Sequence, residues 1–398
     1  MIREWLIEAY LLVFRLLFGT FKWIPLKDKV TFVVSFGDNS QYVYEEMRRK
    51  NISFDVVFLC KGNSQNRFQI YEDAAVVNMG GANPIDLVRM AYHLATSRYV
   101  FVDNYYGFLA VTHFKPEVEC VQLWHASGAI KKFGLMDSSV KHRSKRAQER
   151  FHKVYSRFRK IIVGSDTMAQ YFMNAFGVKG ENILRTGIPR TDFFYNQNEK
   201  ERIFNEITKQ NELLWNKKVI LYAPTYRDHE LDRFKLEMDL DKMYKELSDD
   251  YVLVLRLHPA IKHAEDYSKK YTDFVLNYSS NEYDINELLI VTDVLITDYS
   301  SIPYEYSLLN KPMIFFAYDL DTYEADRGLW ENYEQMVPGP VVKTTEDIIN
   351  TIKQNDFDMN QIEEFSRKWN KYSKGHSSEN LVSYLFDQKP IVSKQRAL

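Results

Sequence analysis

The sequence predicts an α/β protein made of two doubly wound, Rossmann-like domains that face a central cleft. Short apolar segments alternate with helical segments twice along the chain, and polar side chains follow several of these segments where they end. The expected strands are TFVVSF, DVVFLC, AAVVNM, YVFVDN, CVQLWH and KIIVGS in the first half, and KVILYA, YVLVLR, FVLNYS, VLITDY, MIFFAY and VVKT in the second. Six strands that alternate with helices complete a doubly wound sheet, so each half is expected to form a domain.

The length of the chain agrees with this division. A domain typically has roughly 100–200 residues, and the chain has 398. We place the boundary near residues 190–215 and expect an amphipathic helix over 1–27, a first domain over 28–195 and a second over 196–398. For the last helix, near 373–386, packing back on the first domain is one alternative.

Composition excludes several functional classes. The 52 basic and 54 acidic side chains leave a formal charge of −2, which does not suit a protein built to bind nucleic acid. Cys60 and Cys120 stand in or beside apolar strands, which indicates buried thiols rather than a disulfide framework or a metal cluster. The sequence has no GxxxxGK[ST] loop and no GxGxxG after its first strand, and it demands neither a cofactor nor a metal.

The N-terminal segment MIREWLIEAYLLVFRLLFGTFKWIP predicts a helix that is apolar on most of its circumference. Charges interrupt it too often for a bilayer span, and it has no small-residue cleavage site. Glu8, Arg15 and Lys22 are spaced by seven and share one narrow polar stripe. The alternatives are an in-plane membrane anchor, packing on the protein itself, and packing on a second subunit of a homo-oligomer.

A basic segment, residues 141–160, predicts a second amphipathic helix. It carries nine Lys or Arg and the single acid Glu149, with Phe151, Val154, Tyr155 and Phe158 at helical spacing. The commoner reading is a solvated face with its apolar stripe in the core. Near an interfacial first helix, the same charges would be attracted to an anionic membrane surface.

Strand-end loops in the second half predict an anion site. Thr225 and Arg227 follow one expected strand, His258 follows the next, and Ser300 and Ser301 follow a third and stand before the helix that Pro303 opens. In parallel α/β sheets ligands bind outside the carboxyl ends of the strands, so these side chains are expected to converge there. Taken singly, His258 suits a structural histidine, and Ser300, Ser301 or Asp298 suits a helix cap.

The first half offers its own candidate, in the segment CVQLWHASGAIKKFG. His125 stands just past the end of a strand, Ser127 and Gly128 would allow a ligand to approach closely, and Lys131 and Lys132 would open a helix. A neutral imidazole can take a proton from a hydroxyl at physiological pH, so His125 is a candidate general base. A structural histidine is the alternative.

These segments resemble a known family. The segments WHASGAIKKFG, LYAPTYRD, LRLHPA, ITDYSSIPYEYSLLNKPMIFFAYDLDTYEADRG and RKWNKYSKGHSSENL are similar to those of the CDP-glycerol glycerophosphotransferases that build wall teichoic acid in Gram-positive bacteria. The resemblance covers nearly the whole chain in order. It implies a GT-B fold and transfer of glycerol 3-phosphate from CDP-glycerol, with release of CMP, to an undecaprenyl-diphosphate-linked ManNAc-GlcNAc disaccharide at the cytoplasmic face of the membrane.

The resemblance also implies roles for the candidate residues. His125 would be the general base and His258 the second catalytic residue, which holds the diphosphate and stabilises the departing CMP. The substrate-binding residues would be Ser127, Lys131, Thr225, Arg227, Asp298, Ser300, Ser301 and Arg327. Positioning and charge neutralisation are most of what phosphoryl transfer asks of a protein, so these groups can serve without Mg²⁺.

Within the family, the sequence is most similar to the glycerol-phosphate primases. The polymerases typically read WHGTP where this chain has Ala126 and Ser127 after its histidine. One alternative is a chain-extending transferase for poly(glycerol phosphate) or ribitol phosphate on the same fold. The other is a non-catalytic membrane scaffold, against which the intact His125 and His258 argue.

Overall fold

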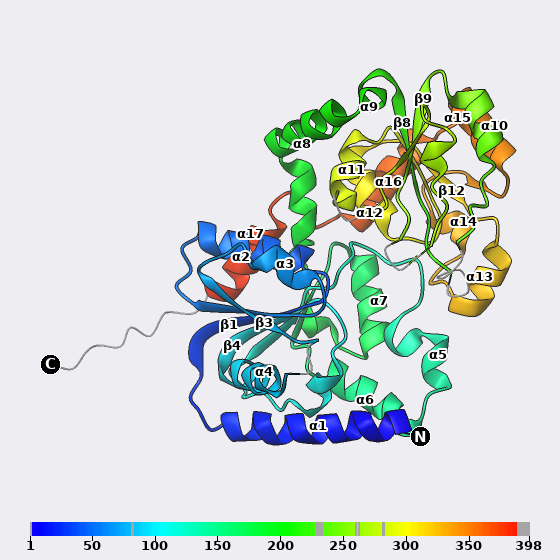
Figure 1. Cartoon of the computed structure of the whole chain (residues 1–398). Coiled ribbons are helices and arrows are strands. Elements are labelled where there is room, and N and C mark those ends of the chain that lie inside the picture. Colours follow the sequence, from blue (N-terminus) through cyan, green and yellow to red (C-terminus); the bar gives the residue numbers. More distant parts are fainter. Residues whose placement is uncertain are drawn as a thin grey trace. The chain divides into compact units, whose positions relative to one another are not determined.

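The computed structural model of this chain describes residues 2–80, 83–227, 234–258, 261, 263–280 and 283–387 (Figure 1). They divide into two compact units. The first unit comprises the residues up to His125, then Phe133–Asp192, and the residues from Tyr372 onward. The second comprises Ala126–Lys132 and Phe193–Lys371, so a short segment after His125 belongs to it.

The first unit is built on a seven-stranded sheet in the order β3-β2-β1-β4-β5-β6-β7, with every neighbouring pair parallel. The strand order reverses between β1 and β4, which is the topological switch of a doubly wound sheet. The loops after β1, β4 and β5 therefore meet at one edge. The strands are β1 (Lys27–Val34), β2 (Asp55–Cys60), β3 (Ala74–Asn78), β4 (Ser97–Val102), β5 (Glu119–Gln122), β6 (Lys160–Ile162) and β7 (Ile183–Leu184).

Helices cover both faces of this sheet, so its central strands are apolar on both sides. On one face lie α2 (Asp38–Arg49), α3 (Ser64–Phe68) and α17 (Ser377–Phe386); on the other lies α4 (Pro84–Thr96), with α1 (Ile2–Phe21) beyond it (Figure 1). The remaining helices are α5 (Ser138–Lys141), α6 (Lys145–Tyr155) and α7 (Asp166–Phe176), with 3₁₀ turns η1 (Gly107–Val111), η2 (Gly134–Met136) and η3 (Gly180–Asn182). In the core, the ring of Phe32 stacks between Phe58, 5.0 Å away, and Phe101, 4.8 Å away.

The second unit repeats the same plan with a six-stranded parallel sheet in the order β10-β9-β8-β11-β12-β13. Its switch lies between β8 and β11, so the loops after these two strands are neighbours. The strands are β8 (Lys218–Ala223), β9 (Tyr251–Leu255), β10 (Val275–Asn277), β11 (Val294–Thr297), β12 (Met313–Phe316) and β13 (Val341–Val342). The expected strands are thus confirmed in both halves, and β7 was not foreseen.

Short helices surround the second sheet. They are α8 (Gln197–Gln210), α9 (Glu212–Asn216), α10 (Leu240–Leu247), α11 (Ile285–Val291), α12 (Ile302–Tyr306), α13 (Leu320–Arg327), α14 (Tyr333–Met336), α15 (Thr345–Gln354) and α16 (Met359–Trp369), with 3₁₀ turns η4 (Pro189–Tyr195), η6 (Tyr267–Lys269) and η7 (Ser307–Leu309). Apolar side chains of α10 and α15 pack in one core with β8, β9 and β11.

Two expected helices differ in the structure. Residues 141–160 do not form one helix, because α5 ends at Lys141 and α6 begins at Lys145, where the Ser144 side chain accepts a hydrogen bond from the N–H of Ala147. Lys131 does not open a helix either, since it forms an antiparallel bridge with Leu329.

Candidate functional site

His125 follows β5 in the first unit, and its ring is held in one orientation. Its Nδ1 atom lies 3.1 Å from the carbonyl oxygen of Asp103. A carbonyl can only accept, so Nδ1 carries the proton and Nε2 is left with its lone pair. The imidazole stacks between the rings of Phe36, 4.2 Å away, and Trp124, 4.4 Å away. This is the tautomer that a general base acting through Nε2 requires.

The half-buried position of His125 keeps its ring uncharged. Desolvation lowers the pKa of His125 to about 4, and the positive charge of Arg190 acts in the same direction, against the hydrogen bond to Asp103. The imidazole is therefore neutral at physiological pH, which is the protonation state of a base.

The backbone that carries His125 is strained, and hydrogen bonds from neighbouring side chains hold it in place. Trp124 has a φ of +57°, a conformation that bulky residues rarely adopt. The Trp124 N–H donates to the side-chain oxygen of Gln122 (2.8 Å), and the Asn39 amide donates to the carbonyl oxygens of Leu123 and Trp124 (3.0 Å each). Sequence reasoning missed these hydrogen bonds, although Asn39 stands in the first turn of α2, shortly after β1, where a doubly wound fold places functional residues.

Asp103 connects this loop to the rest of the site, and it too was missed. Its carboxylate is almost fully buried and accepts hydrogen bonds from the N–H groups of Ser35, Phe36 and Gly37 and from the hydroxyl of Tyr106 (2.6 Å). Desolvation raises the pKa of Asp103, while these four donors act in the opposite direction. Asp103 thus fixes His125 through its carbonyl and positions the Phe36 ring through its carboxylate.

In the second unit, Asp298 is the centre of the loop after β11. One carboxylate oxygen accepts from the N–H groups of Thr225 (2.7 Å) and Tyr299 (2.6 Å), and the other accepts from Arg227 (3.0 Å). The remaining donors of the Arg227 guanidinium bind both oxygens of Asp319, at 2.7 and 3.0 Å. Thr225, Arg227 and Asp298 therefore lie together. The guanidinium of Arg227, which follows β8, links the loops after β11 and β12 by its hydrogen bonds to Asp298 and Asp319.

Ser300 and Ser301 lie beside this network at the start of α12. The Ser300 hydroxyl lies 2.9 Å from that of Thr297 and accepts from the N–H of Ile302 at 3.3 Å. Ser301 occupies the N-cap position, but its side chain makes no capping hydrogen bond. Both residues are half-buried at the carboxyl edge of the sheet.

Lys131, Arg327 and the imidazole of His258 are the candidate anion-binding groups of the second unit. His258 is exposed three residues beyond β9, and its ring contacts that of Tyr226 with 4.5 Å between centroids. Partial desolvation, and then the charges of Lys131 and Arg256, lower the pKa of His258. Lys131 also lies over the ring of Tyr323, 5.9 Å from its centre. Arg327 ends α13 and acts on the same tyrosine.

The residues just after His125 are used within the second unit. Ser127 is buried, and both its N–H and its hydroxyl donate to the Glu305 carboxylate, at 3.1 and 2.9 Å. A Cβ on Gly128 would lie 2.4 Å from the Tyr304 ring. The close approach that Gly128 allows is therefore made by this tyrosine.

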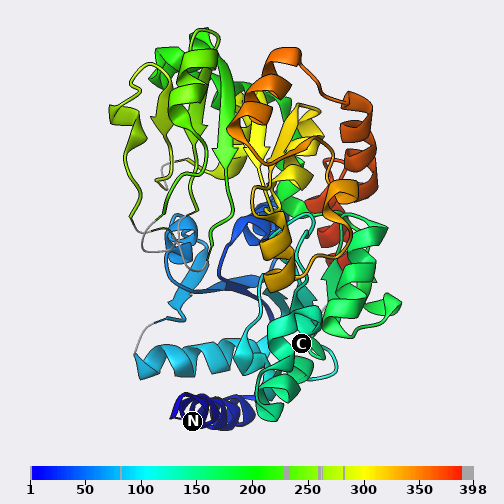
Figure 2. The same ribbon diagram turned by 90° about the vertical axis from the view of Figure 1, so that its right-hand side faces the viewer.

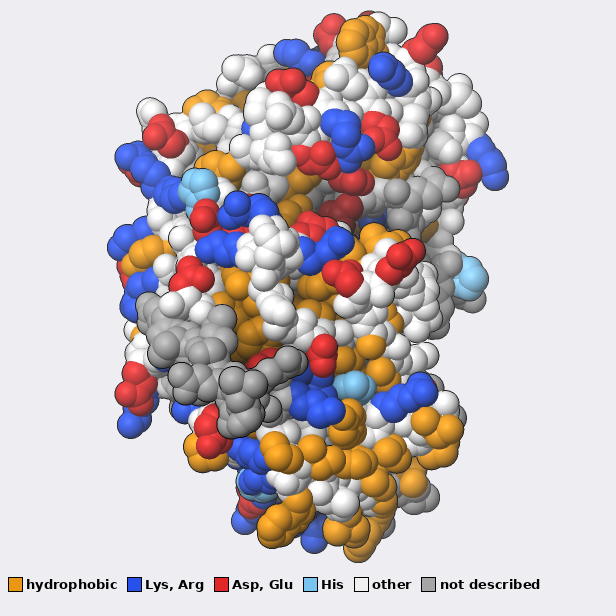
Figure 3. Space-filling model, turned by 90° about the vertical axis from the view of Figure 1, so that its left-hand side faces the viewer, with side chains coloured by type: hydrophobic (Ala, Val, Ile, Leu, Met, Phe, Trp, Pro, Cys, Tyr) orange, Lys and Arg blue, Asp and Glu red, His pale blue; other side chains and the backbone are white. Residues whose placement is uncertain are grey.

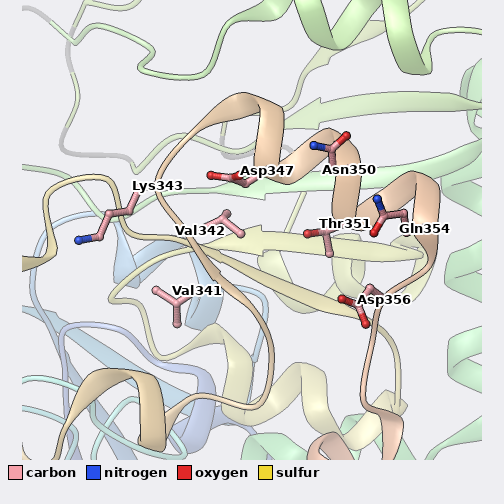
Figure 4. A pocket seen from close by; sticks show the side chains of 8 residues that line it. All are labelled: Val341, Val342, Lys343, Asp347, Asn350, Thr351, Gln354 and Asp356. Carbon is pink, nitrogen blue, oxygen red and sulfur yellow. The ribbon is translucent and has the colours of Figure 1, made fainter.

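A separate open pocket lies at the edge of the second sheet, between β13 and α15 (Figure 4). None of its eight lining side chains, among them Lys343, Asp347 and Asn350, belongs to the strand-end loops described above. Because open surface hollows are common and the polar groups here do not converge, we assign no role to it. Among the described residues, no three His, Cys, Asp or Glu side chains gather as metal ligands do.

Two parallel-sheet units with polar strand-end loops and no glycine-rich dinucleotide loop are the architecture of a GT-B-like fold. The chain belongs to the CDP-glycerol:poly(glycerophosphate) glycerophosphotransferase family, whose model matches residues 17–387. It is 36% identical to the teichoic acid glycerol-phosphate primase of Bacillus subtilis (strain 168), over 96% of this chain and 98% of that protein. It is 34% identical to a teichoic acid poly(ribitol-phosphate) polymerase of Bacillus spizizenii, over 96% of this chain and 60% of that protein.

Solved structures agree with this assignment. The wall teichoic acid polymerase TagF superposes with a TM-score of 0.77 at 27% identity, over 91% of this chain and 89% of that one. A TagF variant soaked with CDPG superposes with a TM-score of 0.76 at 26% identity, over 94% and 93%. The protein is therefore a glycerophosphotransferase of wall teichoic acid synthesis with a GT-B-like fold.

Proposed function

We propose that this enzyme is a teichoic acid glycerol-phosphate primase. It transfers glycerol 3-phosphate from CDP-glycerol to a lipid-linked ManNAc-GlcNAc disaccharide and releases CMP. Its similarity to a primase along nearly the full length of both chains supports this assignment. The observation that carries the chemistry is the neutral His125 ring, whose Nδ1–H donates a hydrogen bond to the Asp103 carbonyl oxygen.

In this mechanism, Nε2 of His125 takes the proton from the acceptor hydroxyl as its oxygen attacks the phosphorus that bears glycerol. A new P–O bond forms, the bond between that phosphorus and the bridging oxygen breaks, and the electron pair leaves with CMP. A positioned general base commonly contributes roughly 10²–10⁴-fold to the rate. We assign acceptor activation to the first unit on the basis of this residue.

The donor belongs to the second unit. Lys131, Arg327 and His258 accompany strand-end loops that carry the hydroxyls of Ser300 and Ser301, and this combination suits a diphosphate that gains charge as CMP departs. Thr225, Arg227 and Asp298 shape the loop between them. We assign to Arg227 a positioning role, because its donors are taken up by Asp298 and Asp319.

The proposed acceptor is anchored in the bilayer, so we place the enzyme peripherally at the cytoplasmic face of the membrane. Helix α1 supports this placement. It buries Leu11, Phe14 and Phe18 against its own unit and exposes an apolar face on the other side, made of Trp5, Leu6, Leu12, Val13 and Leu16. Figure 3 shows apolar side chains gathered at the lower edge of the first unit, over this helix. Within the described residues, no helix is long and apolar enough to cross a membrane.

The test is incubation with CDP-glycerol and a short-tailed lipid disaccharide, read by mass spectrometry. We expect the addition of one glycerol phosphate and the release of CMP, and no product from His125→Ala. A ladder of added units would replace the primase by a chain extender, and addition from CDP-ribitol instead of CDP-glycerol would identify a ribitol-phosphate transferase. No transfer from either donor would leave a non-catalytic scaffold.

A further inference from the structure

The Phe36 ring is an exposed aromatic surface directly beside the proposed base. It stacks on the His125 imidazole with 4.2 Å between ring centroids and 18° between the ring planes. Even so, the side chain keeps 47% of its surface exposed. Exposed apolar side chains are common on proteins, so exposure by itself does not indicate a ligand. Here the exposed ring also contacts the residue proposed to act on the acceptor.

The turn that carries Phe36 is fixed by the fold. Its N–H and those of its chain neighbours Ser35 and Gly37 donate to the buried Asp103 carboxylate, at 2.8, 3.0 and 3.0 Å. Gly37 has a φ of +100°, and a Cβ at this position would lie 3.1 Å from the ring of Phe68. The turn therefore packs closely against α3 and needs a glycine there. A side chain on such a turn loses little freedom when a ligand binds to it.

Polar side chains border this turn. Arg67, in α3, lies against Gly37, because a Cβ on that glycine would be 3.2 Å from the arginine Cδ atom. Its guanidinium pairs with the Asp38 carboxylate at 2.7 Å and donates to the side-chain oxygen of Gln41 at 3.1 Å. Helices α2 and α3, which carry these residues, cover the same face of the first sheet, opposite α4 (Figures 1 and 2). Arg67 and Asp38 both remain partly exposed.

Asp38 also connects this border to the base. Its second carboxylate oxygen lies 3.4 Å from a guanidinium nitrogen of Arg190, and the same nitrogen donates to the carbonyl oxygen of His125 at 3.0 Å. Arg190 is buried, and all of these residues belong to the first unit. A group that binds to Asp38 and Arg67 is therefore held at a fixed position relative to the imidazole.

An aromatic face bordered by an arginine and a carboxylate matches the chemistry of a pyranose sugar. One face of such a sugar presents mainly C–H hydrogens, which carry small positive charges and pack on the negative face of an aromatic ring. Its hydroxyl and amide groups need hydrogen-bond partners at the edge, which a guanidinium and a carboxylate supply. A linear polyol phosphate has no such face and would be attracted to the arginine alone.

The stacked sugar is not the one that reacts. The face of Phe36 toward His125 is covered, so a ligand stacks on the opposite face, roughly 4 Å from the phenyl ring and about 8 Å from the imidazole. A base must lie within roughly 2.6–3.2 Å of the hydroxyl that it deprotonates. The next sugar along the acceptor therefore supplies the reacting hydroxyl.

We propose that Phe36 is a stacking platform for the inner sugar of a disaccharide acceptor, and that Arg67 and Asp38 bind polar groups of this sugar. The outer sugar then presents its hydroxyl to His125. The inference rests on the primase function proposed above and names the residues that distinguish a disaccharide from a single sugar.

The experiment compares two acceptors by steady-state kinetics, a short-tailed lipid disaccharide and its outer sugar alone on the same tail. An aromatic contact typically contributes a factor of roughly ten, so the wild type should have a kcat/KM about tenfold higher for the disaccharide. In Phe36→Leu, which keeps an apolar side chain beside His125 but removes the flat ring, this ratio should fall to about one. Any effect on His125 itself changes both acceptors equally and leaves the ratio unaltered. Phe36→Tyr keeps the ring and should keep the preference.

Arg67→Gln should lower the same ratio, because the inner sugar loses a charged hydrogen-bond donor. The matched control is Arg48→Gln, which removes the same charge from α2, where Arg48 pairs with Asp73 at 3.1 Å. Its ratio should equal that of the wild type. An unchanged ratio in Phe36→Leu overturns the platform, since the ring would then only position His125. Weaker binding of CDP-glycerol to Phe36→Leu in calorimetry would also overturn it, because the ring would then contact the donor.

A binding measurement separates this proposal from the primase function. Ligand-observed NMR titration with the methyl glycoside of the disaccharide requires no transfer. If the wild type transfers to neither acceptor yet binds this glycoside about tenfold more tightly than Phe36→Leu does, the primase assignment fails and the sugar site stands. If the wild type transfers to both acceptors with equal kcat/KM, the sugar site is wrong and the primase assignment stands.

Discussion

Replacement of Asp103 by asparagine should change the stability of the first unit only slightly and should lower turnover much more. The Asp103 carboxylate accepts from three consecutive N–H groups, those of Ser35, Phe36 and Gly37, and from the Tyr106 hydroxyl. In Asp103→Asn, the amide can keep one oxygen toward the N–H groups and turn its nitrogen toward Tyr106. The three backbone bonds then lose their charge assistance.

The magnitude follows from these bonds. A hydrogen bond to a charged group is typically worth about 1 kcal/mol more than a neutral one, so three of them give a loss of about 3 kcal/mol. Burial of a charge opposes this loss, and the raised pKa of Asp103 indicates that burial offsets most of it, so we expect a net change in stability of less than about 1 kcal/mol. The larger effect falls on turnover, because Phe36 stacks on the His125 ring and a misplacement of about 1 Å can cost roughly 10²-fold.

The assay combines thermal unfolding, steady-state kinetics and a pH profile. Asp103→Asn should lower kcat while the KM for CDP-glycerol stays unchanged. The apparent pKa of the acid limb of its kcat/KM profile should rise. A loosened Phe36 lets water reach His125, so the pKa of His125 rises toward 6.5. The control is Asp73→Asn, whose carboxylate accepts from Tyr44 at 2.7 Å before β3, at the opposite edge of the same sheet. If Asp103→Asn loses stability with no change in kcat or in the acid limb, Asp103 is merely structural.

Three further outcomes are expected. His125→Ala should lower turnover roughly 10²–10⁴-fold with CDP-glycerol affinity unchanged in calorimetry, and retention of more than about a tenth of the activity would refute the general base. His258→Ala, Ser301→Ala and Arg327→Ala should each weaken CDP-glycerol binding roughly tenfold, as expected for a lost charge-assisted hydrogen bond; unchanged affinity in all three contradicts the donor site. The wild type should lose stability as pH falls from 6.5 through 4. The pKa of His125 in the folded protein, about 4, is below its ordinary value, so the charged ring is disfavoured in the fold. Urea unfolding at pH 7 and pH 5 should show a smaller difference in the free energy of unfolding for His125→Gln than for the wild type.

Chelation is a fourth test. EDTA is expected to leave transfer largely intact, because the groups proposed to neutralise the diphosphate are protein side chains. Loss of transfer that Mg²⁺ or Mn²⁺ restores would show that a divalent ion takes part, and would direct attention to Asp319 and Asp321.

The strands were predictable because parallel strands covered on both faces are continuous apolar runs between turn residues. Strand β7 has two residues, Ile183 and Leu184, and so short a segment leaves no pattern to detect. The break in the segment 141–160 could have been predicted from Ser144, which was overlooked among the charged residues around it. Ser144 precedes Lys145-Arg146-Ala147, and a serine in this position favours a new helix start.

The candidate site was predictable at the level of loops and less so at the level of partners. His125 could be found because it follows a strand end. The choice between phosphate and carboxylate as the partner of Arg227 could not be read from the sequence, because Asp319 is 92 positions away and only the sheet order brings the two together. Asp103 likewise follows a strand, but its role depends on the loop after β1, which the strand order β1-β4-β5 places beside it.

The polar stripe of α1 shows how one sequence pattern divides between two roles. Glu8, Arg15 and Lys22 are spaced by seven, and the spacing alone predicts a single solvated line. In the structure, Glu8 lies 3.2 Å from Arg150 and ties the N-terminal half of the helix to α6. At the other end, burial and then positive charges that include Arg15 and Lys22 lower the pKa of His113. The same stripe therefore ties the helix to its own unit by an ion pair at one end and places like charges near one another at the other end.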